Sequence, residues 1–339
     1  MNAHELVSSN VLTSNGIREP LYVTALKYAG VQVTPEIKPG YIWSLDTSGV
    51  NESLRRWNRS VVTPPPAPPG PALLTIDHLS FSYDGVRQTL EEINFTITEG
   101  EMVSIVGKNG AGKSTLAKLM CGFEKVDKGA ILYKGEDIRH KSIKERAEFI
   151  GFVMQNPNQM ISKNLIFDEI ALGLRLRGVA EEEIKERVEQ VLEVCGLAPF
   201  IDWPISALSY GQKKRVTIAS ILILRPNILI LDEPTAGQDY RHYSEIMEFL
   251  RQINETGISI ILITHDMHLM LEYTPRAIVL SEGRLITDAP ASVVLTTQQV
   301  IEQANLKETS LYRLAQLAGI EDGTQFVQHF IDHEKVAAR

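Results

Sequence analysis

Cysteine, long apolar runs and excess positive charge are all scarce in this chain of 339 residues. Its two cysteines, Cys121 and Cys195, lie far apart and match no metal-ligand spacing. Their apolar, helix-like surroundings predict that both are buried and reduced, as in a reducing cytoplasm, so a disulfide framework is not indicated. A membrane-spanning helix needs about 18 apolar residues in a row, and the most apolar stretch, 218–231, is broken by Arg225 and the Pro-Asn that follows it. The first residues also lack a signal-peptide pattern, so any membrane role is expected to come through a partner.

The net charge also bears on which kinds of partner the protein can bind. The net charge of -8 argues against a broad, non-specific nucleic-acid surface, although a local basic patch remains compatible with it. Hydrophobic residues make up 44% and charged residues 22% of the chain, which is typical of a globular protein.

The stretch GKNGAGKST, residues 107–115, has the spacing of a phosphate-binding loop. An apolar strand-like run at 102–106 precedes it, and 116–120 suits a helix. Glycines let the backbone wrap a phosphate, Lys113 adds positive charge, and Ser114 offers a hydroxyl to Mg²⁺. The alternative, a glycine-rich turn with an exposed lysine, does not explain this flanking context. Tyr83, at the end of a strand-like run, is the aromatic expected against an adenine ring, and an ordinary tyrosine on a strand face is the alternative that remains open. The predicted ATP-binding residues are Tyr83, Gly107, Lys108, Asn109, Gly110, Ala111, Gly112, Lys113, Ser114 and Thr115.

An acidic pair follows the continuous apolar run 228–231, which is typical of a strand buried on both faces of a parallel sheet. Asp232 at such a strand end can bind Mg²⁺. Glu233 beside it is positioned to orient a water and take its proton during phosphoryl transfer, and is our candidate catalytic residue. The alternative is an acidic pair that only caps a helix.

Two further polar residues follow predicted buried strands. Gln155 comes after 150–154 and His265 after 260–264. Because ligands of open parallel sheets bind at the carboxyl ends of the strands, we expect both near the phosphate loop. His265 would contact the γ-phosphate and orient the attacking water, and Gln155 would complete the Mg²⁺ shell. A structural histidine and an exposed loop amide are the alternatives that remain open.

The stretch LSYGQ, residues 208–212, places small or flexible residues at the predicted start of a helix. Backbone amides there can receive an anion. The stretch is too distant along the chain from residues 107–115 to be their local partner, so Ser209, Tyr210, Gly211 and Gln212 are predicted to serve a second nucleotide site in trans.

Composition divides the chain into four segments. Residues 1–63 read as a polar leader with one helix in 18–30, and residues 64–71 as a proline-rich linker, with a ligand for a proline-binding module as the alternative. Residues 72–290 begin with three strand-like runs, 73–76, 79–83 and 93–97, and contain an amphipathic helix at 181–196, which predicts a helical subdomain at about 156–210. Residues 291–339 read as a helical extension.

Taken together, these motifs resemble the ATP-binding-cassette ATPases over residues 72–290. The resemblance implies an α/β fold of the P-loop type, with a parallel or mixed core sheet and an antiparallel subdomain before it. It also implies two cassettes arranged head to tail, with each ATP held between one phosphate loop and the partner's LSYGQ. Tyr83 matches the adenine-stacking aromatic, Asp239 the dimer-contact loop, and Lys113, Glu233 and His265 the catalytic set, with ATP and Mg²⁺ bound.

A narrower resemblance points to the energy-coupling-factor importers of vitamins and metal ions. It rests on FSY at 81–83, QNP at 155–157 and LSYGQKKR at 208–215. The family implies a transmembrane scaffold, a substrate-binding membrane subunit, a place at the cytoplasmic face of the membrane and no nucleic-acid partner. The leader resembles the connector between cassettes of tandem members such as hydroxymethylpyrimidine/thiamine or cobalt-type importers, so we expect this chain to be the second half of such a protein or a separately encoded cassette.

The sequence differs from the usual family motifs at two places, and three alternative functions compete with this interpretation. Tyr210 replaces the more usual glycine of the signature, and Asn158-Gln159-Met160 stands where many relatives have acidic residues. The main rival is a soluble cassette protein acting on nucleic acid or ribosomes. A non-hydrolysing regulatory cassette is disfavoured by Glu233 and His265, and a small-molecule kinase gives no reason for LSYGQ. The transported solute is not readable from the sequence.

Overall fold

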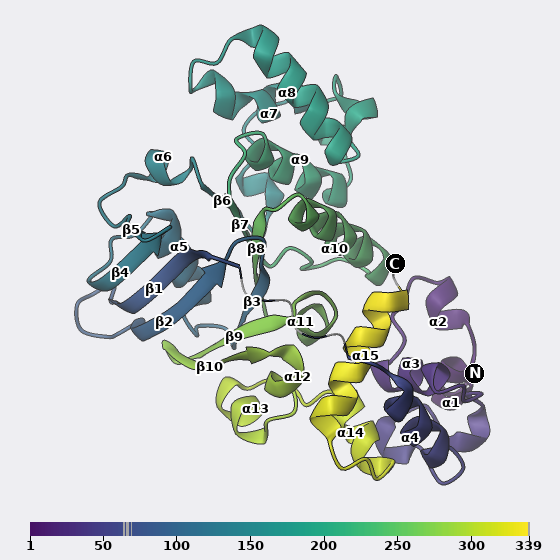
Figure 1. Cartoon of the computed structure of the whole chain (residues 1–339). Coiled ribbons are helices and arrows are strands. Elements are labelled where there is room, and N and C mark those ends of the chain that lie inside the picture. The colour runs from purple at the N-terminus through teal and green to yellow at the C-terminus, as the bar shows by residue number, and fades with distance from the viewer. Residues whose placement is uncertain (64, 66–67, 69, 338–339) are drawn as a thin grey trace.

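The computed structural model describes residues 1–63, 65, 68 and 70–337, which form two sheets and three groups of helices (Figure 1). The expected proline-rich linker therefore lies partly outside the described residues, at 64, 66, 67 and 69. Within the described part of the chain, no helix combines the length and apolar character needed to cross a bilayer.

The larger sheet has the strand order β10-β9-β3-β8-β7-β6. Its strands are β3 (Met102–Val106), β6 (Ile150–Val153), β7 (Ile228–Asp232), β8 (Ser259–Thr264), β9 (Arg276–Ser281) and β10 (Arg284–Pro290). All neighbours are parallel except β10 and β9, which form an antiparallel hairpin. Every residue of β3 and β8 is buried, as expected when helices cover both faces of a parallel sheet. The carboxyl ends of β3, β6, β7 and β8 consequently share one edge, which we call the nucleotide edge.

The smaller sheet is antiparallel, with the order β2-β1-β4-β5. It comprises β1 (Ala72–Phe81), β2 (Leu90–Thr98), β4 (Lys128–Tyr133) and β5 (Glu136–Asp137). The two strands expected at 73–76 and 79–83 are one strand, β1, which ends at Phe81, so that prediction was wrong in its boundaries. His78 has a left-handed φ of 47° and the pairing register shifts around it. The His78 amide donates to Asn94 Oδ1 at 2.7 Å. His78 therefore forms a β-bulge within β1, and the strand continues on both sides of it.

Helices α5 (Lys113–Cys121) and α10 (Tyr240–Glu255) pack against strands of the larger sheet, and α6 (Ile143–Arg146) and α11 (Met267–Tyr273) are shorter helices. A helical region made of α7 (Ile166–Arg175), α8 (Glu181–Val194) and α9 (Tyr210–Leu222) stands above the sheet in Figure 1. Helix α8 matches the predicted amphipathic helix. It ends at Val194 with Cys195 as its C-cap, and Gly196 follows in the left-handed region at φ 64°, where glycine carries no Cβ penalty.

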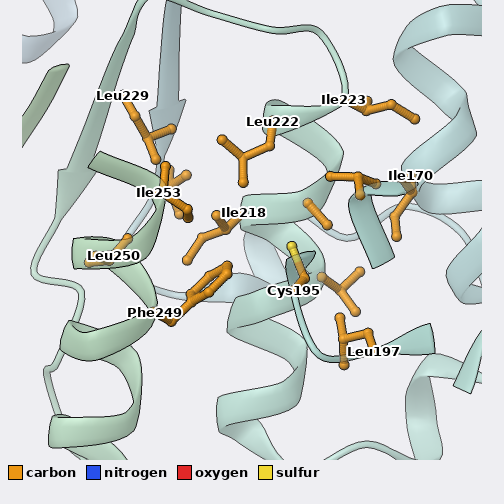
Figure 2. Close-up of a cluster of buried hydrophobic side chains, with 14 of the residues drawn as sticks. Ile170, Cys195, Leu197, Ile218, Leu222, Ile223, Leu229, Phe249, Leu250 and Ile253 are labelled. Atoms are coloured by element: carbon orange, nitrogen blue, oxygen red, sulfur yellow. The ribbon is translucent and has the colours of Figure 1, made fainter. Parts of the chain in front are cut away.

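One apolar cluster joins this helical region to the sheet. Figure 2 shows side chains from α7, α9, α10 and β7 meeting in it. Ile218 and Leu222 of α9 lie in the cluster, with Phe249 and Leu250 of α10 and Cys195 beyond α8. Both cysteines are buried and unpaired, as predicted. Helix α9 is therefore fixed along much of its length by tightly packed side chains.

The leader forms four helices, α1 (Ala3–Ser8), α2 (Val11–Ser14), α3 (Leu21–Tyr28) and α4 (Asn51–Ser60). The C-terminal segment forms α12 (Ala291–Val294), α13 (Gln298–Ala304), α14 (Ser310–Leu317) and α15 (Gly323–Ala337). The two ends of the chain lie side by side and share one apolar cluster (Figure 1). We call α1–α4 with α12–α15 the helical body. Helix α3 fits the helix expected in 18–30, but the sequence pattern did not predict its packing against residues about 300 positions later.

Candidate functional site

The loop 107–112 joins β3 to α5, in the strand–loop–helix arrangement that the sequence predicts. Two of its glycines are required by geometry. Gly107 has φ 150°, and a Cβ there would lie 2.1 Å from the Leu280 carbonyl oxygen. Gly112 has φ 102°, and its Cβ would lie 2.5 Å from Leu90 Cδ2. Side chains at either position would push the loop off the neighbouring strands, so the backbone stays free to receive an anion at the start of α5.

Lys113 is buried beneath this loop, with 7% of its surface exposed. Its Nζ donates to the carbonyl oxygens of Gly107 at 2.7 Å and Lys108 at 3.1 Å. Burial lowers the pKa of Lys113, while the nearby Glu233 and Asp232 carboxylates work against that change. A buried ammonium held by two carbonyl groups is well suited to a negatively charged ligand, because a phosphate would supply the charge partner that the loop does not.

Ser114 and Asp232 meet beside Lys113. The Ser114 hydroxyl donates to Asp232 Oδ2 at 3.2 Å. The pKa of Asp232 is raised, mainly by burial, and the Ser114 hydrogen bond opposes that shift. A hydroxyl and a carboxylate oxygen in contact are ligands of the kind Mg²⁺ prefers, so the residues present fit a magnesium ion. Gln155 follows β6 with an exposed side chain at the same sheet edge.

Glu233 and His265 form a direct pair at the ends of β7 and β8. His265 Nδ1 lies 2.6 Å from Glu233 Oε1, and the Thr264 hydroxyl lies 3.4 Å from Oε2. The Glu233 side chain is 13% exposed and that of His265 is 65% exposed. Glu233 also has a left-handed φ of 47°, and its amide donates to the Ile263 carbonyl at 2.8 Å. A non-glycine residue held in that region indicates a constrained turn, which here aims the carboxylate along the nucleotide edge.

A cavity of about 770 Å³ opens at this edge. The phosphate loop contributes Gly107, Lys108 and Asn109 to its wall, and Glu233 and His265 contribute from the strand ends. Residues 305–310, from the end of α13 to the first residue of α14, also line it. The volume is within the range of small-ligand sites. The C-terminal segment thus borders the site, which nothing in the sequence pattern indicated.

Tyr83 lies outside this cavity, on the loop beyond β1. It is 56% exposed, stands edge-on to Phe81, and its hydroxyl lies 3.4 Å from Thr115 Oγ1 on α5. The ring is therefore beside the helix that follows the phosphate loop, and a face of it is accessible to a flat ligand.

The LSYGQ residues are not among those that line the 770 Å³ cavity. Ser209 is the N-cap of α9: its hydroxyl accepts from the Gln212 amide at 3.3 Å, and Gln212 Oε1 accepts from the Ser209 amide at 2.9 Å. Ser209, Gly211 and Gln212 line a second cavity of about 510 Å³, with Arg215 and residues of α10. The capping box fixes this helix start.

Asp239 is the exposed N-cap of α10, next to the residues of α10 that line the second cavity. Its carboxylate accepts from the His242 amide at 2.9 Å and lies 2.8 Å from His242 Nδ1. These hydrogen bonds, the backbone one first, lower the pKa of Asp239. Asp239 therefore lies between residues 235–237, which line the first cavity, and Arg241 and His242, which line the second.

Sequence reasoning missed one connection to Gln155. The Gln155 carbonyl oxygen accepts from Lys214 Nζ at 2.7 Å and from the Tyr210 hydroxyl at 3.2 Å. Lys214 is 1% exposed, and burial lowers its pKa to about 8. The sequence contained one indication of this connection: Tyr210 and Lys214 are four residues apart, and residues at that spacing share one face of a helix.

Comparison with family models places the chain among known proteins. The model described as "ABC transporter" matches residues 90–236. The model described as "ATP-binding cassette cobalt transporter" matches residues 9–81, which covers most of the leader and β1. A third model, for an AAA domain, matches residues 201–272.

Relatives that align with nearly the whole chain carry the same kind of description as the family models. A Clostridium perfringens protein named for an ABC transporter ATP-binding role is 56% identical over 336 residues, 99% of this chain and 59% of its own length. An Enterococcus faecalis protein of the same description is 52% identical over 334 residues, 98% of this chain and 58% of its own length. The chain thus spans about three-fifths of the curated relatives it matches.

A solved structure shares the fold. It is cbiO1 from Clostridium perfringens, described as part of the ABC transporter complex cbiONQ. The match has a TM-score of 0.64 and 36% identity over 69% of this chain and 94% of that one. The folded motifs, the family models and this relative together show that the chain belongs to the ATP-binding cassettes of the ABC transporter family.

Proposed function

We propose that this chain binds MgATP at the nucleotide edge and hydrolyses it to drive a membrane transporter. The observation that supports this most strongly is the 2.6 Å contact between Glu233 and His265, because it sets a carboxylate base and its positioning histidine beside a phosphate loop. A cassette that only binds nucleotide has no need for that pair.

Each residue then has a defined task. Lys113 and the amides of 107–115 hold the β- and γ-phosphates, and Tyr83 stacks on the adenine. Ser114, Asp232 and Gln155 would hold Mg²⁺, which supplies charge neutralisation on the transferring phosphoryl group. Glu233 orients the attacking water and accepts its proton. His265 holds that carboxylate in place through Nδ1. The exposed part of its ring would hydrogen-bond to the γ-phosphate.

We further propose that the site is completed in trans. The start of α9 offers the backbone amides of Tyr210 and Gly211 beside a second cavity, so these amides would contact ATP held by a second cassette. Asp239, exposed at the start of α10, would contact that partner. ATP binding closes the pair and hydrolysis reopens it.

The transporter that fits best is an energy-coupling-factor importer. The leader's match to a cobalt-transporter model and the likeness to cbiO1 support this subtype and favour a metal ion over a vitamin or vitamin precursor as cargo. The partners would be a second cassette, a transmembrane scaffold and a substrate-binding membrane subunit, with this chain on the cytoplasmic face and the region after Gln155 in contact with the scaffold. The family matches give no support to the nucleic-acid or ribosomal alternative.

A mild-detergent pull-down of the tagged chain, with mass-spectrometric identification of co-purifying proteins, tests the assignment. Recovery of a second cassette and membrane subunits is the expected result. Recovery of ribosomes or nucleic acid without a membrane subunit would contradict the transporter assignment while leaving ATP hydrolysis open to separate measurement.

A further inference from the structure

One helix holds the backbone of Gln155 through two side chains. Tyr210 and Lys214 stand one turn apart on α9, and both donate to the Gln155 carbonyl oxygen, at 3.2 Å and 2.7 Å. Lys214 Nζ also donates to the Met154 carbonyl at 3.0 Å. Three hydrogen bonds therefore fix the two residues that follow β6, although 55 residues or more separate them from their donors.

Lys214 is an unusual group to find in this position. It is 1% exposed, and among the described residues both of its hydrogen bonds end on backbone carbonyls. Asp232 and Glu233 favour its charged form from a distance. A buried ammonium is costly to desolvate, and a methionine would fill similar space. The lysine is therefore better explained by the carbonyl groups that it holds than by packing.

The same end of α9 carries the signature, since Tyr210 is one of its residues and Lys214 follows one turn later. Ser209 caps α9, and the backbone amides proposed to contact the partner's ATP belong to its first turn. The side of α9 that carries Ile218 and Leu222 is locked in the apolar cluster of Figure 2. Because Tyr210 belongs to the first turn of α9 and Lys214 stands one turn further along, a displacement of that turn relative to Gln155 is passed to the Gln155 carbonyl through their hydrogen bonds.

We propose that Tyr210 and Lys214 are positioning residues that couple the signature, which contacts ATP in the partner's site, to Gln155 of this chain's own site. The proposal rests on the proposed function above. Tyr210 stands where many cassettes have glycine, and its hydroxyl supplies one of the three bonds. Each cassette can therefore place its own Gln155 according to whether the partner holds ATP, which makes the two sites cooperative.

Four variants of the protein, assembled with the partner subunits of the wild-type complex, test this. Lys214→Met keeps the volume and removes the donor, and Lys214→Gln restores a shorter donor. Tyr210→Phe removes one hydroxyl only. Lys213→Met changes the neighbouring, half-buried lysine and serves as the matched control. The readouts are kcat, the Mg²⁺ concentration for half-maximal activity, the Hill coefficient for ATP, and ATP affinity by equilibrium binding.

For Lys214→Met we expect a kcat lowered about tenfold, a raised Mg²⁺ requirement and a Hill coefficient that falls toward one, because hydrogen bonds to a charged group are lost. ATP affinity should stay within about twofold. Lys214→Gln should recover part of the loss, Tyr210→Phe should show a smaller effect of the same kind, and Lys213→Met should match the wild type.

Unchanged kcat, Mg²⁺ requirement and Hill coefficient in folded Lys214→Met would overturn the proposal, as would an equal effect of Lys213→Met. If Lys214→Met fails to fold, Tyr210→Phe decides alone: wild-type cooperativity in that variant contradicts the coupling. A wild-type complex without ATPase activity would instead refute the proposed function, so the two failures are distinguishable.

Discussion

The nucleotide edge and the helical body are built on different principles. At the nucleotide edge, Gln155, Glu233 and His265 each follow a parallel strand, so the order of the strands alone brings them together. In the helical body, residues from the two ends of the chain meet only through side-chain burial. Trp57 of α4 packs edge-on against Phe326 of α15, with ring centroids 5.5 Å apart. Short sequence motifs therefore predict the arrangement at the nucleotide edge, but they do not predict the packing of the helical body. Changes at the nucleotide edge should therefore affect chemistry, and changes in the helical body should affect stability.

The largest effect is expected at Glu233. Glu233→Gln keeps the shape and the contact with His265 but removes the base, so ATP turnover should fall by about 100-fold to 10,000-fold. Steady-state phosphate release measures it. Glu182→Gln on the exposed face of α8 is the matched control and should keep wild-type turnover. Unchanged turnover in Glu233→Gln would remove this residue from the proposed role.

In the helical body, Leu54→Ala should destabilise the protein without altering the chemistry. Leu54 is fully buried on α4, and loss of such a side chain costs about 2–5 kcal/mol of the free energy of unfolding. Urea unfolding measures this loss, and ATP affinity of the folded variant should stay at the wild-type value. Trp43→Ala, at a site that is 77% exposed, should change stability by less than about 0.5 kcal/mol. A loss of ATP affinity in folded Leu54→Ala would break the contrast between the two regions.

The junction between the two regions should respond to pH. Arg18 of the leader pairs with Glu272 on α11 and lies over the rings of Tyr240 and Tyr243. Burial raises the pKa of Glu272 from 4.5 to about 7; Arg18 opposes this, and Glu334 and Asp266 add to it. Between these two values the folded chain keeps a proton that the unfolded chain has released. The free energy of unfolding should therefore fall as pH rises through this window, by up to about 3 kcal/mol from this group.

Urea unfolding of the wild type and Glu272→Gln at several pH values between 4.5 and 8 isolates this contribution. The stability of Glu272→Gln relative to the wild type should rise as the pH increases, because the variant has no proton to release at that position. Parallel pH dependences for the two proteins would show that Glu272 titrates normally.

The smallest effect is expected at Tyr83. Loss of stacking in Tyr83→Leu should weaken ATP binding about fivefold to tenfold, with no change in stability because the side chain is exposed. Tyr83→Phe keeps the ring, loses the contact with Thr115, and should bind ATP as the wild type does. Equal weakening in both variants would assign the effect to the hydroxyl rather than to stacking.

The sequence predicted where the strands beside the site end, because a buried parallel strand appears in a sequence as a continuous apolar run. The apolar run before Asp232 and the run before His265 both predicted a strand end, and the structure has those strands at Ile228–Asp232 and Ser259–Thr264. The missed features depend on tertiary contacts. His78 adopts a left-handed conformation through a hydrogen bond to Asn94, which no local pattern encodes. The Tyr210–Gln155 contact spans 55 residues, and Leu54 finds its partners near the far end of the chain.

The most direct test of the nucleotide edge is the identity of the nucleotide that the protein retains. Wild-type, Glu233→Gln and Glu233→Gln/Lys113→Ala proteins are incubated with MgATP, passed through a desalting column and analysed for bound nucleotide. We predict intact ATP on Glu233→Gln, ADP or no nucleotide on the wild type, and none on the double variant, because in the proposed mechanism Lys113 holds the phosphates and Glu233 accepts the proton of the attacking water. ADP formed on Glu233→Gln at the wild-type rate, or ATP retained by the double variant, would contradict the account.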